Sequence, residues 1–163
     1  MDSTELRQIF GQFATGITVV CTCDKQGRSY GITVNSFSSV SLEPPLALFC
    51  LDKQSETLLP VLETGILSFN ILGAGQSALS NRMATKGGVE KMRGLDTKTS
   101  VSGAPILKDC VAYLDGRIYQ THEAGDHYII VAEILDIGLG ERQEPGLLYY
   151  RSAYRGVGDE INE

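Results

Sequence analysis

Small polar side chains crowd the segment of residues 33–45. Four serines, one threonine and one asparagine fall within positions 33–41, where a core strand would carry aliphatic residues. The hydroxyls can satisfy the backbone of a strand end and loop. Alternatively, they can join exposed amides in binding a phosphate or the ring carbonyls of a heteroaromatic ligand. The composition of the segment does not choose between these two interpretations.

Two other segments match the letters of motifs without the structural context that the motifs need. Residues 73–78 fit the dinucleotide fingerprint, yet no apolar strand ending in an acid follows the expected helix. His122 and His127 are five residues apart, whereas a zinc-binding helix places its histidines four apart on one face. We therefore expect a strand-to-helix turn at the glycines and a β-turn between the histidines.

The four cysteines are expected to be structural thiols. Cys21, Cys50 and Cys110 lie in apolar runs typical of strands, where free cysteine behaves as a small hydrophobic residue. Cys21 and Cys23 are two residues apart, a spacing that rarely allows a disulfide within one strand. Neither histidine is near a cysteine pair, so we expect no zinc site.

The overall composition is that of one globular domain. The chain has 163 residues, of which 42% are hydrophobic and 21% are charged, close to the average for folded proteins. Its net charge of −6 argues against a general nucleic-acid binder or a peripheral membrane protein, because both depend on basic residues. The longest apolar run, residues 46–51, is far too short to span a membrane. The acidic first five residues do not resemble a signal peptide, so we expect a soluble intracellular protein.

Hydrophobic periodicity divides the chain into short strands and three short helices. Leu6, Ile9, Phe10 and Phe13 form one apolar stripe on the first expected helix. Turns at residues 24–27 and 123–126 predict two hairpins. The helices are expected at residues 3–13, 55–63 and 76–85, and the strands at residues 16–23, 29–35, 46–51, 66–72, 110–122, 127–138 and 147–151.

The remaining segments complete the expected organisation. Pro60 is expected to kink the second helix because it lies beyond the first turn. Residues 86–105 show no periodicity and predict a long loop. Residues 156–163 contain three acids and no base, which predicts a mobile acidic tail after a domain of residues 1–155. This set of elements favours a mainly β fold, a closed antiparallel β-barrel with peripheral helices.

Positive charge gathers in residues 82–98, although the chain as a whole is acidic. The segment contains five bases and two acids, a local charge of +3. A mobile basic loop beside a binding pocket would attract phosphates. An ordinary solvated loop can have the same composition. The five bases are Arg82, Lys86, Lys91, Arg93 and Lys98.

An ordered set of segments resembles the flavin reductase family with the FMN-binding split-barrel fold. This family supplies the small reductase components of two-component flavin-dependent monooxygenases. Each segment is weak by itself, but together they extend from about Leu6 to Arg155 in the order of the family. They are residues 10–20 (FGQFATGITVV), 33–45 (TVNSFSSVSLEPP), 53–57 (KQSET), 69–72 (FNIL), 79–82 (LSNR), 125–127 (GDH) and 148–151 (LYYR), with Tyr154.

The resemblance implies an antiparallel split barrel of Greek-key type and an NAD(P)H:flavin oxidoreductase. Hydride would pass from NADH or NADPH to FMN or FAD, and the reduced flavin would go to a companion flavin-dependent oxygenase. The resemblance also implies a homodimer and a cytoplasmic location, and the net charge of −6 argues against a nucleic-acid or membrane partner. Because the cofactors carry this chemistry, the protein needs no strong acid, base or nucleophile.

The resemblance assigns three groups of residues to the site. The first would line the flavin ring and ribityl chain, the second would hold the flavin phosphate at a helix start, and the third would face the nicotinamide nucleotide. The flavin-lining residues are Thr33, Val34, Asn35, Ser36, Phe37, Ser39 and Val40. The phosphate group is Lys53, Gln54, Ser55, Thr57, Arg82 and Lys86. The nicotinamide group is His127, which would position the nicotinamide ring, with Tyr149, Tyr150, Arg151, Ser152 and Tyr154.

Simpler roles remain open for some of these residues. His127 can merely close a hairpin turn, Arg82 can be a solvated surface charge, and the tyrosines can serve barrel or dimer packing. Two other functions are also open. One is an electron carrier with tightly bound FMN, like a flavoredoxin. The other is a non-enzymatic split barrel that binds flavin or haem.

Overall fold

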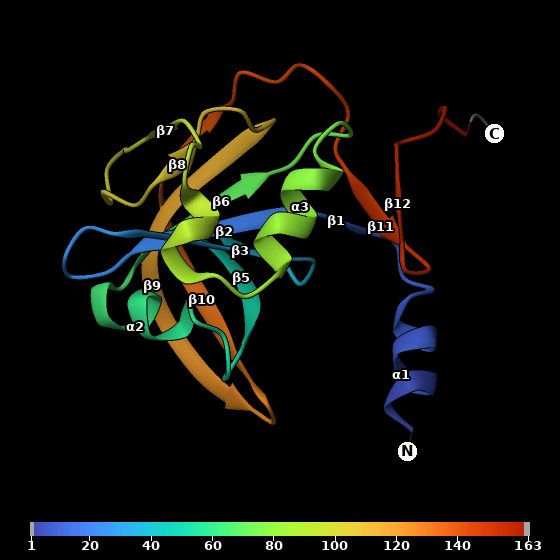
Figure 1. Cartoon of the computed structure of the whole chain (residues 1–163), viewed down its shortest axis with the longest axis horizontal. Helices are drawn as coiled ribbons and strands as arrows, with labels where there is room; N and C mark the ends of the chain where they lie inside the picture. Colours follow the sequence, from blue (N-terminus) through green and yellow to red (C-terminus); the bar gives the residue numbers. More distant parts are fainter. Residues whose placement is uncertain (1, 162–163) are drawn as a thin grey trace.

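Antiparallel strands build most of the molecule (Figure 1). The computed structural model describes residues 2–161. The strands of its main sheet are β2 (Thr18–Cys23), β3 (Ser29–Val34), β4 (Ser38–Leu42), β5 (Pro45–Asp52), β6 (Ile66–Ile71), β9 (Ala112–Ala124) and β10 (His127–Leu139). They lie in the order β3-β2-β6-β9-β10-β5-β4, and every neighbouring pair is antiparallel.

The main sheet is rolled, as the connection between β3 and β4 requires. These strands lie at opposite ends of the sheet order, yet only residues 35–37 connect them. Seven strands about 4.8 Å apart would make a flat sheet about 29 Å wide. Four residue steps, from the end of β3 to the start of β4, reach at most about 14 Å. The two ends of the sheet are therefore brought together, and residues 35–37 bridge them.

Two hydrophobic cores lie on opposite faces of β2, because successive strand residues point to opposite sides. On one face, Val20 packs with Phe49 and Phe69 inside the rolled sheet. On the other face, Val19 packs with Met83. Met83 belongs to α3 (Ser77–Ala84), and the 3₁₀-helix η1 (Gly88–Met92) also contributes to this second core. Burial on both faces makes β2 the rigid centre of the fold.

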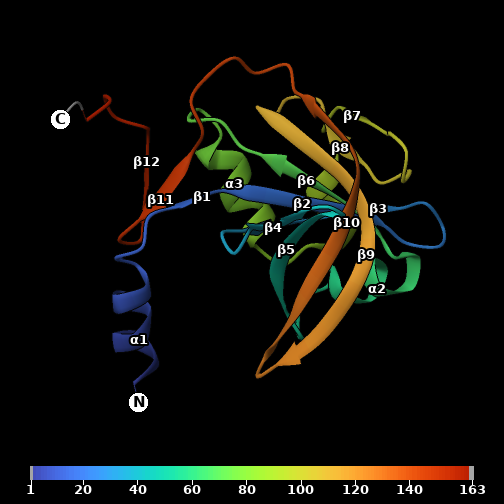
Figure 2. The same ribbon diagram turned by 180° about the vertical axis from the view of Figure 1, so that it is seen from behind.

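A smaller sheet stands at one side of the main sheet. It consists of β1 (Thr15–Gly16), β11 (Leu148–Tyr150) and β12 (Ala153–Arg155), in the order β1-β11-β12. The helix α1 (Ser3–Phe10) precedes it and hangs away from the main sheet in Figures 1 and 2. None of the α1 residues is buried. The apolar stripe predicted for this helix is therefore exposed on the described part of the chain.

Most of the expected elements are confirmed. The hairpins β2–β3 and β9–β10 form where the turn residues predicted them, and Gly125 adopts the left-handed φ of 62° in the second turn. The glycines of residues 73–78 lie between β6 and α3, and η1 rather than a parallel strand follows α3. His122 and His127 lie on the facing strands β9 and β10, not on a helix.

Four expectations about the secondary structure are wrong. The helix α2 (Leu58–Thr64) begins at Leu58, so Pro60 falls in its first turn, where its missing N–H breaks no helical hydrogen bond. Residues 86–105 are not one structureless loop, because they contain η1 and β7 (Thr97–Lys98), which pairs with β8 (Ile106–Leu107). The polar segment forms β4, and β12 follows the last expected strand.

The cysteines are free, as expected. Burial raises the pKa of Cys21 to about 12 and the pKa of Cys110 to about 11, so both remain protonated at neutral pH. Met1 and residues 162–163, which belong to the expected domain and tail, lie outside the described residues. Within residues 2–161, no helix has the length and apolar character that crossing a membrane requires.

Candidate functional site

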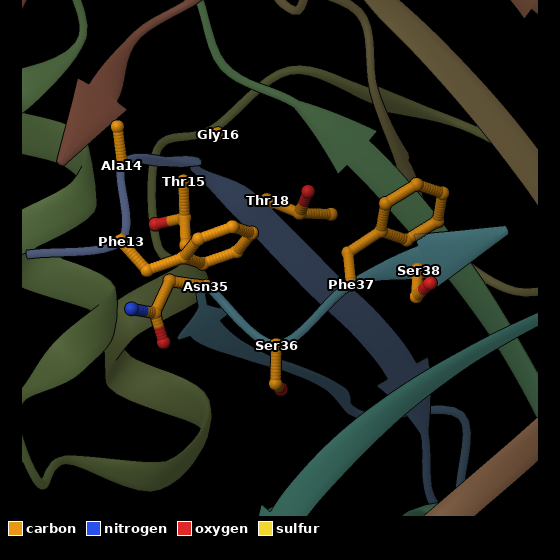
Figure 3. A pocket seen from close by; sticks show the side chains of 9 residues that line it. All are labelled: Phe13, Ala14, Thr15, Gly16, Thr18, Asn35, Ser36, Phe37 and Ser38. Atoms are coloured by element: carbon orange, nitrogen blue, oxygen red, sulfur yellow. The ribbon is translucent and has the colours of Figure 1, made fainter. Parts of the chain in front are cut away.

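A large pocket lies where residues 35–37 bridge the ends of the rolled sheet (Figure 3). Its volume is about 530 Å³. Figure 3 shows Phe13, Thr15 and Asn35 at one end and Phe37 at the other. The buried Oγ1 of Thr15 has no hydrogen-bond partner in the described part of the chain, so it can bond to a polar ligand. The lining residues are Phe13, Ala14, Thr15, Gly16, Thr18, Asn35, Ser36, Phe37 and Ser38.

A second pocket continues from the first, and Asn35 lines both. Its volume is about 240 Å³. The Thr33 hydroxyl donates to the Ser80 carbonyl over 2.7 Å, and the Tyr154 hydroxyl donates to Ser80 Oγ over 2.9 Å. These bonds fix β3 and β12 against α3. The lining residues are Ile17, Thr33, Val34, Asn35, Ser80, Asn81, Ala84, Tyr149 and Tyr154.

A third pocket, of about 220 Å³, shares Ala84 with the second. Its walls are strongly polar and include two lysines and two acids. The lining residues are Ile32, Asp52, Gln54, Ser55, Glu56, Ala84, Thr85, Lys86 and Lys91. Neighbouring pockets share a lining residue, and we refer to the three together as the groove. Aromatic rings and hydroxyls line the first pocket, and the ammonium groups line the third.

The turn after β5 shapes the ammonium end of the groove. Asp52 Oδ1 accepts from the Gln54 amide over 2.7 Å, and Ser55 Oγ accepts from the Thr57 amide over 3.2 Å. Gln54, Ser55 and Lys86 line the third pocket, so the structure brings these three predicted site residues together. Thr57 is buried as the N-cap of α2 and is not among the lining residues.

Lys91 is a groove residue that the sequence analysis missed. Only 7% of it is exposed, and its Nζ donates to the Met83 carbonyl over 2.9 Å. Burial lowers the pKa of Lys91, because it disfavours the charged form. An ammonium has three donors, so the described contact leaves others for a ligand. Its position in an aperiodic basic segment carried no signal that the side chain would be buried.

Arg82 and Lys53 do not line the third pocket. The Arg82 Nη2 donates to the carbonyls of Arg93 over 2.5 Å and Glu90 over 3.4 Å, which braces the segment around η1. Lys53 pairs with Glu123 across the β9–β10 hairpin. Neither base therefore lines the third pocket with Ser55, with which the sequence analysis had grouped them.

His127 lies at the start of β10, opposite Asp52 of β5. Its Nδ1 is 2.7 Å from Asp126 Oδ1, and its hydrogen bond and charge lower the pKa of Asp126. Because Asp52 begins the turn that carries Ser55, His127 belongs to the ammonium end of the groove region. It is not among the lining residues of the three pockets.

The β11–β12 hairpin divides its predicted site residues. Tyr149 and Tyr154 line the second pocket, and their rings pack edge-on with centroids 5.4 Å apart. Arg151 and Ser152 form the turn and point toward α1, where Arg151 Nε donates to Gln12 over 2.8 Å. They line a separate pocket with Arg7. The Arg151 guanidinium lies 5.0 Å from the Tyr150 ring centroid.

The polar segment has a structural role at some residues and lines the groove at others, which keeps ligand binding a prediction for the latter. Ser36 Oγ accepts from the Cys50 amide over 2.9 Å and thereby anchors residues 35–37 to β5, which is a structural role. Val34 belongs to the core and Phe37 packs against it, and both residues also line pockets of the groove. Asn35 lines two pockets. Ser39 and Val40 are exposed on β4 and line neither pocket.

A rolled antiparallel sheet with a groove of this polarity defines a split-barrel protein of the flavin reductase type. Residues 10–158 match the flavin reductase like domain, and the chain belongs to that family. A flavin reductase of Pseudomonas putida is 35% identical over 156 residues, covering 96% of this chain and 91% of the relative.

Two solved structures share the fold over nearly the whole chain. The nitrilotriacetate monooxygenase component B homologue of Mycobacterium thermoresistibile has a TM-score of 0.91 at 32% sequence identity. The match covers 99% of this chain and 90% of the homologue's chain. The NADH:FAD oxidoreductase of Streptomyces globisporus, in complex with NAD and FAD fragments, has a TM-score of 0.89 at 31% sequence identity. The match covers 99% of this chain and 96% of the oxidoreductase chain. The mainly β, split-barrel fold expected from the sequence is confirmed.

Proposed function

We propose that this protein is an NAD(P)H-dependent flavin reductase that supplies reduced flavin to a partner monooxygenase. The observation that carries the proposal is the groove, which joins an aromatic and hydroxyl-lined end to an ammonium-lined end through Asn35 and Ala84. A flavin nucleotide has the same order of groups, a flat heteroaromatic ring, a polyhydroxy chain and a phosphate. Its close relatives include an NADH-dependent FAD reductase of Streptomyces globisporus, 32% identical over 99% of this chain.

The residues present fit a flavin. The unpartnered Thr15 hydroxyl and the Asn35 amide offer hydrogen bonds to the polar edge of the ring. Tyr149 and Tyr154 border the middle of the groove, where the ribityl chain would lie. Ser55, Lys86 and Lys91 offer a hydroxyl and two ammonium groups to the phosphate. FMN and FAD share these three parts, so both are candidate substrates.

The protein contributes binding and orientation to the reaction. When both nucleotides are bound, hydride passes from the nicotinamide C4 to the flavin N5, a transfer that the cofactors themselves provide. The chain must stack the two rings within reach and keep water out. Phe13, which is 77% exposed at the mouth of the first pocket, is placed to cover a bound ring. We assign His127, beside the turn after β5, and Arg151 and Ser152, in the β11–β12 turn, to separate contacts with the nicotinamide nucleotide.

We propose that the protein works as a cytoplasmic homodimer. The exposed apolar stripe of α1 supports this assembly, because Ile9, Phe10 and Phe13 are each at least 65% exposed. Leu42 of β4 adds a further exposed side chain. A second copy that covered α1 would also lie close to the first pocket, since Phe13 follows α1 by three residues and lines this pocket.

Steady-state oxidation of NADH and NADPH, with FMN and FAD as varied substrates, tests the proposed function. We expect oxidation of the nicotinamide nucleotide to saturate with flavin, and flavin fluorescence to be quenched on binding in the micromolar range, about −8 kcal/mol. Reduced flavin that leaves the protein under anaerobic conditions distinguishes a reductase from an electron carrier with tightly bound FMN. Flavin binding without turnover would identify a non-enzymatic binding protein. Absence of quenching at millimolar flavin would contradict the proposal.

A further inference from the structure

The third pocket contains a carboxylate where an anion is expected to bind. Glu56 lies directly after Ser55, and its Oε2 accepts hydrogen bonds from the backbone amides of Gly87 over 2.8 Å and Gly88 over 3.0 Å. A carboxylate beside a phosphate would weaken binding by like-charge repulsion unless its charge were compensated. The role of Glu56 therefore needs an explanation of its own.

The backbone at residues 87–88 is shaped around this carboxylate. Gly87 has a φ of 149° and Gly88 a φ of 49°, a combination that side chains rarely tolerate. It points two successive amides at one acceptor, as in the backbone nests that bind anions. A Cβ on Gly87 would lie only 3.1 Å from Lys91 Cγ. The two glycines thus permit both the double hydrogen bond and the close approach of Lys91.

The charge of Glu56 is compensated where it lies. The hydrogen bonds from Gly87 and Gly88 lower its pKa, and the charges of Lys91 and Lys86 act in the same direction. Glu56 therefore stays ionised at neutral pH and is already engaged on its own side of the pocket. This arrangement suits a structural link better than a ligand for the flavin.

The link joins the two walls of the third pocket. One wall is the turn that carries Ser55, and the other is the segment that carries Lys86 and Lys91. The Lys91 bond to Met83 and the Arg82 bonds to Glu90 and Arg93 hold this segment to α3. Among these contacts, the hydrogen bonds of Glu56 connect the segment that carries Lys86 and Lys91 to the turn that carries Ser55.

We propose that Glu56 is a positioning residue for the flavin phosphate: it clasps Gly87 and Gly88 so that Lys86 and Lys91 face Ser55 across the pocket. This inference rests on the proposed function and adds to it. A competing possibility is that Glu56 blocks the pocket and must be displaced by phosphate. The two hypotheses predict opposite changes in phosphate affinity when Glu56 is replaced. Removal of a clasp weakens phosphate binding, and removal of a block strengthens it.

Dissociation constants of FMN and riboflavin, measured for the same variants, test the proposal. Riboflavin lacks the phosphate, so the ratio of the two constants reports the phosphate contacts. We expect Glu56→Ala and the shorter Glu56→Asp to lower FMN affinity about tenfold, the effect of one lost hydrogen bond to a charged group, with riboflavin affinity unchanged. Glu56→Gln, whose amide oxygen can accept both bonds, should keep the wild-type ratio.

The controls separate this inference from the proposed function. Glu90→Ala removes an exposed acid of η1 that pairs with Arg93, and should leave the ratio unchanged. In steady-state assays, Glu56→Ala should raise KM for FMN without lowering kcat. The proposed role of Glu56 would be overturned if Glu56→Ala and Glu56→Asp left the dissociation constant of FMN unchanged or lowered it. Equal losses of affinity for FMN and riboflavin would also overturn it. Failure of the wild-type protein to bind flavin would instead overturn the proposed function.

Discussion

At the scale of single residues, the site depends on which bases reach the groove. Lys91 and Lys86 line the third pocket with Ser55, whereas Arg82 is bonded to backbone carbonyls elsewhere. Lys91 carries a buried ammonium whose pKa is lowered by burial. The charge of Glu56 offsets part of this effect, and an incoming phosphate would add a second negative charge that stabilises the ammonium.

We expect Lys91→Met to weaken FMN binding by about 1.5–3 kcal/mol, the value of a hydrogen bond to a charged group. Riboflavin binding should stay unchanged, because it lacks the phosphate. Fluorescence titration of both flavins measures the difference. Arg93→Ala removes an exposed base of the same segment, serves as the matched control and should leave the ratio of the two dissociation constants as in the wild type. A larger effect of Arg93→Ala than of Lys91→Met would mean that the phosphate binds elsewhere.

We expect His127→Ala to slow flavin reduction by about 100-fold while changing flavin affinity little. The rate of hydride transfer depends steeply on the distance and angle between the two rings. The loss of one positioning contact can therefore lower this rate by about 100-fold. Anaerobic stopped-flow reduction of the flavin-saturated protein by NADH measures the rate. His122→Ala, on the same hairpin, is the control. Equal rates for both variants would leave His127 as a turn residue.

At the scale of elements, the β2–β3 hairpin depends on one carboxylate. Asp24 accepts hydrogen bonds from the Gln26 amide over 3.0 Å and from the Arg28 amide over 2.9 Å, and it also pairs with the Arg28 side chain. Burial alone would raise the pKa of Asp24, but these bonds together lower it. The turn therefore prefers the ionised carboxylate.

We expect Asp24→Asn to lower the free energy of unfolding at neutral pH. A carboxyl whose pKa is lowered in the folded state stabilises that state at pH values above its ordinary pKa of 3.8. This contribution is lost as the pH falls through the pKa of the folded state. The difference between wild type and variant should therefore be constant above about pH 5 and shrink below pH 3.8. Urea unfolding across this range measures it, and Glu160→Gln in the exposed tail is the control. A difference that persists in acid would assign the effect to amide geometry instead of charge.

At the scale of the whole molecule, α1 lies outside the compact body (Figures 1 and 2). Phe10 is 68% exposed although it belongs to a regular apolar stripe. Such stripes normally pack against another surface. The homodimer proposed above would supply this surface and would stabilise the position of Phe13 at the first pocket.

We expect Phe10→Ser to weaken dimerisation by about 2 kcal/mol, the transfer free energy of a buried aromatic side chain. Sedimentation velocity over a concentration series measures the dissociation constant. Leu139→Ser removes a still more exposed apolar residue at the end of β10 and should leave the dimer intact. A wild-type protein that remains monomeric at all concentrations would contradict the proposed assembly.

The local sequence determined the hairpins, most strands and the helix α3. Their signals lie within a few residues, such as the β-branched residues of β2 and the turn at Gly125, and local sterics and hydrogen bonds act at the same range. The rejection of the dinucleotide fingerprint also followed from local context. The polar segment was recognised as unusual, but its division into the structural Ser36 and the groove-lining Asn35 was not predictable.

The tertiary structure alone decided which charges meet. Lys91, Arg82 and Lys86 fall in one basic segment, and no periodicity distinguishes them there. The packing of η1 against β2 and α3 buries Lys91 at the groove, while the same packing turns Arg82 toward backbone carbonyls. Likewise, Glu56 meets Gly87 and Gly88 across about 30 residues of chain. Contacts between segments so distant depend on how whole elements pack, which local patterns in the sequence do not contain.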